Sequence, residues 1–229
     1  MKKTVFYEEY AYLLALLLIS FSTAMCAAAD FGVSMVVAPA YVLSLKLTAL
    51  TFGQCEYIVQ GTLFVVMLII LKKAKPIYLF SFVSCLLYGF VLDLSRRLVP
   101  AFDPAVCAPG SFAFPVRLTF FVVSSLITAL SIAVYMRSYV YCQVYDFFVK
   151  TVSIHKNIAF RKFKTCYDIA SLVVGVGMSF LFFGALRGIG LGTAILAVIN
   201  GTIIDFIGKL LDRYFEFRPK FPRLAKLFE

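Results

Sequence analysis

The chain has 229 residues, of which 62% are hydrophobic and only 15% are charged, and its formal net charge is +10. Soluble domains carry about 25% charged residues, so this composition excludes an ordinary soluble domain. Apolar runs of about 20 residues recur, each long enough to cross the ~30 Å hydrocarbon core of a bilayer, whereas a membrane β-barrel would show alternating segments of ~10 residues.

The apolar runs predict an all-α, polytopic membrane protein with six transmembrane helices. The first run, residues 10–28, could be taken for a signal peptide, because Ala27-Ala28-Ala29 resembles a cleavage site. Glu8 and Glu9 precede this run and the run is long, so we expect an uncleaved first helix. The other five spans are predicted at residues 54–71, 77–99, 116–136, 165–186 and 188–211.

Two segments between the spans do not fit this pattern. Residues 31–50 are mostly apolar, but Pro39 interrupts them, so a broken span, a re-entrant segment and an interfacial helix all remain open. Residues 137–157 carry several charged and amide side chains and are too polar to span. By analogy between the two, we expect that neither segment crosses the membrane.

The basic residues predict the orientation of the chain. With the N-terminus inside, seventeen of the 22 basic residues fall on the inner side and five on the outer side. This bias favours six spans and cytoplasmic termini. The proline-rich stretch 100–115 is then an external connector, and residues 212–229 form a basic, aromatic cytoplasmic tail typical of a lipid-contacting anchor. The expected partner of these charges is the lipid bilayer and not nucleic acid.

The two halves of the chain repeat one pattern, which is a long apolar helix, a tyrosine-containing segment that does not span, and two further helices. Residues 1–99 form the first three-helix repeat and residues 116–211 form the second. Because each half has an odd number of spans, the second copy must be inverted, an arrangement typical of secondary transporters. The matching positions are Tyr41 with Tyr145, Gly89-x3-Asp93 with Gly201-x3-Asp205, and Cys55-Glu56-Tyr57 with Cys166-Tyr167-Asp168.

Four segments are distinctive: ADFGVSMVVAPAYVLSLKL, YLFSFVSCLLYGFVLD, FRKFKTCYDIASL and GIGLGTAILAVINGTIIDFIGKLLDRYF. In this order they resemble the YitT/YczE family of bacterial integral membrane proteins, particularly its YczE-like branch. The likeness covers almost the whole chain. It implies a six-helix protein of the bacterial cytoplasmic membrane, without the soluble C-terminal domain of the longer YitT-type members, and it implies no particular substrate.

Acidic side chains within the spans are candidate substrate or ion sites, because an ionisable group at the centre of a membrane helix costs about 2.5–3.5 kcal/mol. The predicted topology places two of them toward the outer ends of their helices and two toward the inner ends, so a two-fold axis would exchange the pairs. A structural interpretation also stays open, in which nearby basic residues and helix dipoles hold these acids. The four acids are Glu56, Asp93, Asp168 and Asp205.

Glycines mark a second group of candidate positions. They lack the βαβ context of a dinucleotide fingerprint, so we expect them to form a tight external hairpin and to pack helices closely. A sharper alternative is a substrate site at a broken helix near Pro39 and at its repeat partner Gln143. The packing glycines are Gly89 and Gly201 within spans, and Gly188, Gly190 and Gly192 at the hairpin.

The sequence favours a secondary transporter or permease-like protein for an unidentified small solute, with proton or cation coupling left open. A non-transporting accessory or scaffold protein, and a substrate-binding subunit that needs an energising partner, remain alternatives. The sequence holds no arrangement typical of an enzyme, and its six cysteines and lone His155 lack metal-ligand spacing. No catalytic residue, metal or cofactor is therefore expected, and homo-oligomers or protein partners are left open.

Overall fold

The computed structural model describes residues 3–72, 75–108 and 110–228, most of which are helical. Six helices are long and apolar enough to cross a membrane, and each contains most of one predicted span, so a multi-pass helical membrane protein is confirmed. Two basic residues that support the predicted orientation, Lys2 and Lys73, lie outside the described residues. The six helices are α1 (Glu8–Ala29), α3 (Phe52–Leu71), α4 (Leu79–Leu98), α5 (Phe114–Tyr135), α7 (Phe160–Phe183) and α8 (Leu191–Tyr214).

Two shorter helices, α2 (Ala38–Lys46) and α6 (Val144–His155), occupy the segments that do not fit the spanning pattern. With 9 and 12 residues they are too short to cross a bilayer, which takes about 20 residues. The remaining elements are two 3-10 turns (Pro76–Tyr78 and Pro100–Phe102), the strands β1 (Thr4–Tyr7) and β2 (Phe215–Arg218), and α9 (Pro222–Ala225).

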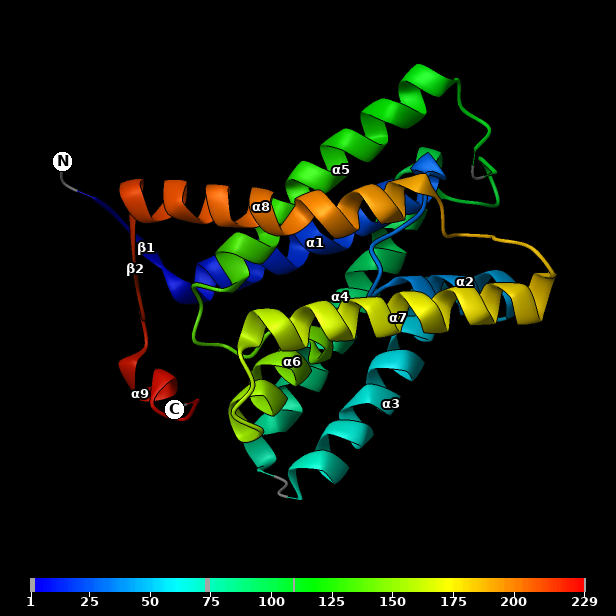
Figure 1. The fold of residues 1–229 in the computed structure, drawn as a ribbon. Helices are drawn as coiled ribbons and strands as arrows, with labels where there is room; N and C mark the ends of the chain where they lie inside the picture. The colour runs from blue at the N-terminus through cyan, green and yellow to red at the C-terminus, as the bar shows by residue number, and fades with distance from the viewer. Residues whose placement is uncertain (1–2, 73–74, 109, 229) are drawn as a thin grey trace.

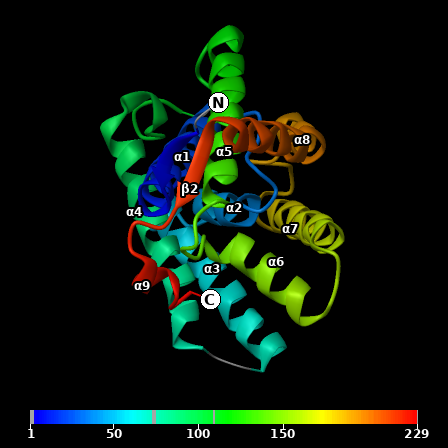
Figure 2. The same cartoon turned by 90° about the vertical axis from the view of Figure 1, so that its left-hand side faces the viewer.

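The helices are arranged around the contact between α1 and α5 (Figure 1). Helix α4 packs against α1, and α8 packs against α5. Helices α2 and α6 each contact both α3 and α7, and they lie below α1 and α8 in the view of Figure 2. Helices α3 and α4 pack along each other, whereas α7 and α8 do not do so within the described part of the chain.

Helix α6 begins beside the middle of α3. The first N–H of α6, that of Val144, donates to Oε1 of Gln60 at 3.2 Å. From this point α6 follows α3, and its buried residues pack in one cluster with Phe64, Met67 and Leu71 of α3. Helix α6 therefore covers only half of the length of α3.

Helix α2 has the corresponding relation to α7. Ala38, its first residue, lies against Gly175 in the middle of α7, and Tyr41 lies against Gly188, beyond the end of α7. The sequence predicts that Pro39 interrupts an apolar segment, but in the structure Pro39 stands in the first turn of α2. Proline is favoured at the start of a helix, because the first N–H groups have no intrahelical partner.

Close packing at glycines differs between the two halves. A Cβ added at Gly89 of α4 would lie 2.3 Å from the Tyr57 ring and 2.9 Å from the Gly53 carbonyl oxygen, both on α3. A Cβ added at Gly192 of α8 would lie 2.6 Å from the Phe31 carbonyl oxygen. At Gly201 nothing lies within 4 Å, so the prediction of helix packing is wrong there, because α8 turns this position away from the other described helices.

The C-terminal tail folds back onto the start of α1. Strands β1 and β2 pair in parallel, and the carboxylate of Glu9 accepts hydrogen bonds from the Lys220 and Phe221 N–H groups, each at 2.9 Å. Further along, Phe228 is buried and its carbonyl accepts from Tyr141 at 3.0 Å. Besides the lipid contact that its composition predicts, the tail therefore makes specific contacts with the body of the protein.

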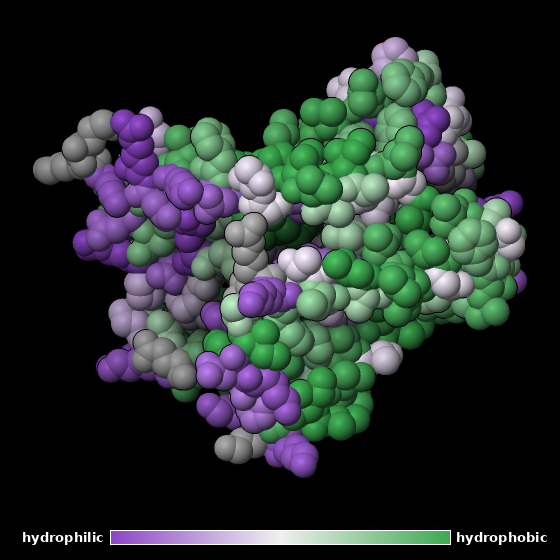
Figure 3. Space-filling view, in the orientation of Figure 1, coloured by the Kyte–Doolittle hydropathy of each residue, from purple (hydrophilic) through white to green (hydrophobic). Residues whose placement is uncertain are grey.

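The surface agrees with a membrane location. Hydrophilic residues gather at the end where both termini lie, and hydrophobic residues cover much of the rest of the face in view (Figure 3). Large apolar side chains on α7 and α8 point outward, as Leu181 and Val198 do with about four-fifths of their surface exposed. Such exposure suits helices that meet lipid.

Candidate functional site

A buried carboxyl group lies in the first half of α3. Glu56 is 0% exposed, and its Oε2 accepts hydrogen bonds from Gln60 Nε2 at 3.0 Å and from the Tyr145 hydroxyl at 2.8 Å. Its other oxygen, Oε1, has no hydrogen-bond partner among the described residues. No described basic side chain forms an ion pair with Glu56. A buried carboxylate without a cation is costly, so protonation is the ready way to remove the charge.

The start of α6 supplies the surroundings of this carboxyl group. Gln143 precedes the helix at its N-cap position, and its Oε1 accepts from Gln60 Nε2 at 3.4 Å. Gln60 in turn caps the Val144 N–H, while Tyr145 reaches Glu56. Because a helix N-terminus carries partial positive charge, this end of α6 favours negative charge on Glu56.

The ionisable groups around Glu56 are neutral. Burial, together with the nearby Glu56 charge, raises the pKa of the Tyr145 phenol well above its ordinary value, so Tyr145 remains a hydrogen-bond donor. Other groups within electrostatic range come from α3, α4 and α7, and none of them carries positive charge. They are Cys55, Cys85, Tyr88 and Tyr167.

The structure therefore brings together two of the predicted site residues, Glu56 and Gln143, through Gln60. Sequence reasoning missed Gln60, and it matched Tyr145 with Tyr41 without naming Tyr145 as a site residue. Gln60 follows Glu56 by four positions, so both lie on one face of α3. A second polar residue at this spacing in an apolar helix is the signal that could have identified it.

Asp93 has a structural environment. Its two oxygens accept from the Thr51 hydroxyl at 2.5 Å and from the Gly53 N–H at 2.9 Å, at the start of α3. Under the structural interpretation of the sequence, Arg96 or Arg97 could pair with Asp93, but neither pair forms among the described residues, and Arg96 lies over the Phe52 ring at 5.5 Å. Asp93 ties the end of α4 to the first turn of α3.

The remaining two acids lie in ion pairs and are not brought together. Asp168 is 2.9 Å from the Lys164 ammonium, which also lies 3.5 Å from Asp146 of α6. Asp205 pairs with Lys209 at 2.6 Å, and its side chain is 65% exposed. The structural interpretation of the sequence predicts the ion pair between Asp205 and Lys209, and this pair forms.

The contrast between Asp93 and Asp205 predicts different effects of their removal. We expect Asp93→Ala to destabilise the protein by about 1–2 kcal/mol, because it deletes an N-terminal capping acceptor. We expect Asp205→Ala to cost less than about 0.5 kcal/mol, the usual range for an exposed pair four residues apart. Unfolding midpoints of the two variants in one detergent would test this, and equal losses would contradict it.

The candidate site around Pro39 has an apolar environment. At the start of α2, Ala38 and Pro39 lie against Gly175 of α7. The start of α6, by contrast, meets two polar side chains of α3, those of Glu56 and Gln60.

The glycines predicted to form a tight hairpin contact the loop before α2 instead, since the Gly192 N–H donates to the Phe31 carbonyl at 2.9 Å. Gly190 also lies against Phe31, and Gly188 has a φ of 75°, a conformation that glycine adopts without strain. The prediction of a tight hairpin is wrong, because α7 and α8 do not pack along each other in the described chain.

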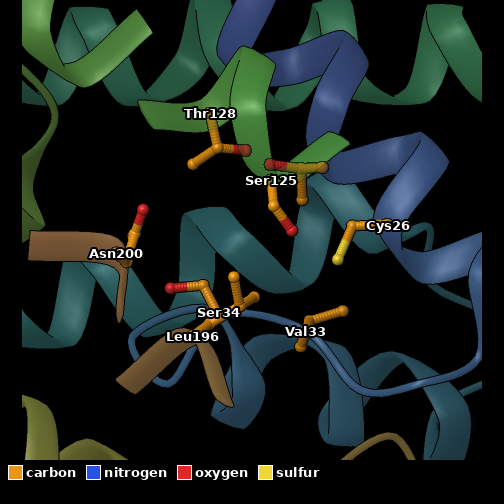
Figure 4. Close-up of a pocket in the computed structure, with 8 residues that line it drawn as sticks. Cys26, Val33, Ser34, Ser125, Thr128, Leu196 and Asn200 are labelled. Carbon is orange, nitrogen blue, oxygen red and sulfur yellow. The ribbon is translucent and has the colours of Figure 1, made fainter. Parts of the chain in front are cut away.

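A small cavity, whose lining is mostly apolar but includes several hydroxyl groups and one amide, lies between α1, α5, α8 and the loop before α2 (Figure 4). Its volume is about 30 Å³. Sequence reasoning missed it, because serine and threonine in apolar helices usually donate to their own backbone and give no distinct signal. Its polar side chains are Thr23, Cys26, Ser34, Ser125, Thr128 and Asn200.

Nothing in the described residues resembles a metal site. No group of three His, Cys, Asp or Glu side chains that could hold a metal occurs there, and all six cysteines are free.

Residues 6–209 match the model of one protein family, the family of unknown function DUF6198. No curated protein and no solved structure matches the chain. Because the match covers most of its length, the chain belongs to the DUF6198 family.

Proposed function

We propose that this protein is a proton-coupled secondary transporter of a small solute, built from two inverted repeats, with Glu56 as the proton site. The observation that carries the proposal is the Glu56 carboxyl group, which is fully buried and, among the described residues, has no cation partner and one oxygen without a hydrogen bond. Intramembrane acids of this kind are typical of proton relays in transporters. We take the coupling ion to be a proton, because the two groups that contact Oε2 of Glu56, the Gln60 amide and the Tyr145 hydroxyl, both donate hydrogen bonds to it.

The pattern of helix contacts supports the inverted repeats. If α1–α4 and α5–α8 are equivalent, the contact of α1 with α4 corresponds to that of α5 with α8. The contact of α2 with α7 likewise corresponds to that of α6 with α3. Each short helix thus packs against the second long helix of the other half, α2 against α7 and α6 against α3, as in transporters whose sites lie at the interface between repeats.

Two hydrogen bonds follow the same symmetry. Ser84 of α4 donates to the Tyr141 carbonyl, in the loop before α6, at 2.8 Å. Thr193 of α8 donates to the Val33 carbonyl, in the loop before α2, also at 2.8 Å. In each case the last helix of one half holds the loop that precedes the short helix of the other half.

The differences between the halves support two conformational states. Helices α3 and α4 are packed together, while their equivalents α7 and α8 are apart in the described chain. A hollow is visible between the surfaces of α8 and α7 (Figure 3). In alternating access, one repeat rocks against the other, so the second state would have α7 and α8 closed and α3 and α4 open.

The resemblance to the YitT/YczE family and the distribution of basic residues favour a bacterial cytoplasmic membrane with both termini in the cytoplasm. In that orientation α2 begins at mid-depth and runs outward, and α6 begins at mid-depth and runs inward. Non-helical backbone at membrane depth is tolerated where protein buries it or where it lines a cavity.

The experiment is a solute screen on purified protein in proteoliposomes adsorbed to a solid-supported membrane. Concentration jumps of sugars, polyols, amides, amino acids and small carboxylates are applied at a fixed pH. We expect at least one solute class to move charge that protein-free liposomes do not move. No signal with any class, together with a partner protein that co-purifies in fixed ratio, would contradict transport and favour the scaffold alternative.

A further inference from the structure

We propose that the cavity between α1, α5, α8 and the loop before α2 binds the solute, and that this solute is a small uncharged molecule with hydrogen-bonding groups. This inference rests on the proposed transport function and adds the place and the class of its substrate. Both repeats contribute to the cavity, since Thr23 lies on α1, Ser125 on α5 and Asn200 on α8. A site at the interface between two repeats is the position that alternating access requires.

The chemistry of the walls selects an uncharged solute. No acidic or basic side chain lines the cavity, so a bound ion would have no countercharge in a region of low dielectric constant. The Asn200 carboxamide and the Ser34 hydroxyl form no hydrogen bond with other described residues, and both are placed at the cavity (Figure 4). An amide offers two donors and an acceptor, and a hydroxyl offers one donor and two lone pairs.

The other hydroxyl groups offer acceptors more readily than donors. Ser125 donates to the Phe121 carbonyl at 2.6 Å, and Thr23 donates to the Ile19 carbonyl at 2.8 Å. Thr128 shares a hydrogen bond with Ser22 at 2.8 Å. The cavity therefore suits a solute that both donates and accepts hydrogen bonds, such as a small amide or polyol.

The size of the cavity limits the solute. A volume of about 30 Å³ holds roughly two water molecules, because a cavity needs about 10–15 Å³ for each water molecule. A solute of four or more non-hydrogen atoms, such as urea or acetamide, therefore needs the cavity to widen in the other conformation of the transport cycle.

One side chain connects the cavity to the proton site. The Tyr88 hydroxyl donates to Thr23 Oγ1 at 3.2 Å, and Tyr88 also lies within electrostatic range of Glu56. Tyr88 is fully buried between the two sites. A solute that changes the hydrogen bonding of Thr23 would therefore act on the surroundings of Glu56 through Tyr88.

The test is equilibrium exchange of radiolabelled acetamide, urea and glycerol across proteoliposomes, with acetate as the charged comparison. We expect the wild type to exchange at least one uncharged probe. Asn200→Leu should reduce that exchange about tenfold, because it removes one or two hydrogen bonds to the solute. Thr202→Leu, an exposed position on α8 outside the cavity, is the matched control and should exchange normally. Ser34→Val is the second cavity variant, in case Asn200→Leu does not fold.

The outcomes separate this inference from the proposed function. Exchange of an uncharged probe that is equal in wild type and both cavity variants would overturn the cavity site. Exchange of acetate alone, or exchange of none of the probes, would also overturn the cavity site. Exchange that depends on Asn200 but never becomes uphill accumulation under a pH gradient would support the cavity site and overturn proton-coupled transport.

Discussion

Glu56→Gln is expected to reduce uphill solute accumulation driven by a pH gradient to the level of protein-free liposomes. Gln has the length of Glu and can keep the hydrogen bonds with Gln60 and Tyr145, so the fold should be retained. Its amide cannot release or bind a proton in the physiological range. The variant therefore imitates the protonated state of Glu56 and removes the only proposed site that changes charge.

The same variant should keep downhill exchange of the solute, because Glu56 does not line the cavity between α1, α5 and α8. Asp205→Asn is the matched control, since Asp205 is exposed and pairs only with Lys209 among the described residues. If both variants lost uphill accumulation, the hypothesis of symmetric acids would hold in place of the Glu56 site. Full accumulation in Glu56→Gln would overturn the proton site itself.

Gly53→Ala is expected to destabilise the protein by about 3 kcal/mol or more, the upper range for an overpacked contact. An added Cβ at Gly53 would lie 2.2 Å from the Gly89 carbonyl oxygen and 2.6 Å from Oδ2 of Asp93. Because the first of these atoms belongs to backbone, only a separation of α3 from α4 relieves the clash. Gly89→Ala should also destabilise the protein, because its added Cβ would clash with the Tyr57 ring and the Gly53 carbonyl oxygen.

Gly201→Ala is the matched control for this prediction. Gly201 occupies the position of Gly89 in the repeated Gly-x3-Asp unit, but nothing lies within 4 Å of an added Cβ. We expect no loss of stability, and a gain of up to about 1 kcal/mol from helix propensity. Thermal unfolding midpoints by circular dichroism in one detergent provide the measurement. Equal losses in Gly89→Ala and Gly201→Ala would contradict the difference between the α3–α4 and α7–α8 contacts.

The hydrophobic runs predicted the six long helices because hydrophobic length is a direct requirement of the bilayer. The starting points of α2 and α6 could not be predicted from composition, because they depend on contacts with distant helices. The Gln60 side chain accepts a hydrogen bond from the Val144 N–H, and Gly175 leaves room for Ala38 to pack against α7. Neither contact leaves a local pattern in the segment that it fixes.

The candidate acids show the same limit. Sequence reasoning identified Glu56 from the cost of an acid within a span, and it grouped Asp93 with Asp205 because both follow a glycine by four positions. In the structure Asp93 caps α3 and Asp205 is exposed beside Lys209. Repetition in sequence indicates a shared origin, but the neighbours that decide a role differ between the two halves.

The proposed inverted arrangement of the two halves is tested most directly by the sidedness of two positions at the C-terminal ends of α2 and α6. Lys46 ends α2 and Lys156 directly follows α6, and both are exposed. Lys46→Cys and Lys156→Cys are introduced singly into a chain in which Cys107 and Cys166 are replaced by serine, and intact cells are treated with a membrane-impermeant maleimide. We expect Lys46→Cys to react from outside, and Lys156→Cys to react only after the cells are opened. Reaction of both positions from the same side would contradict the inverted repeat.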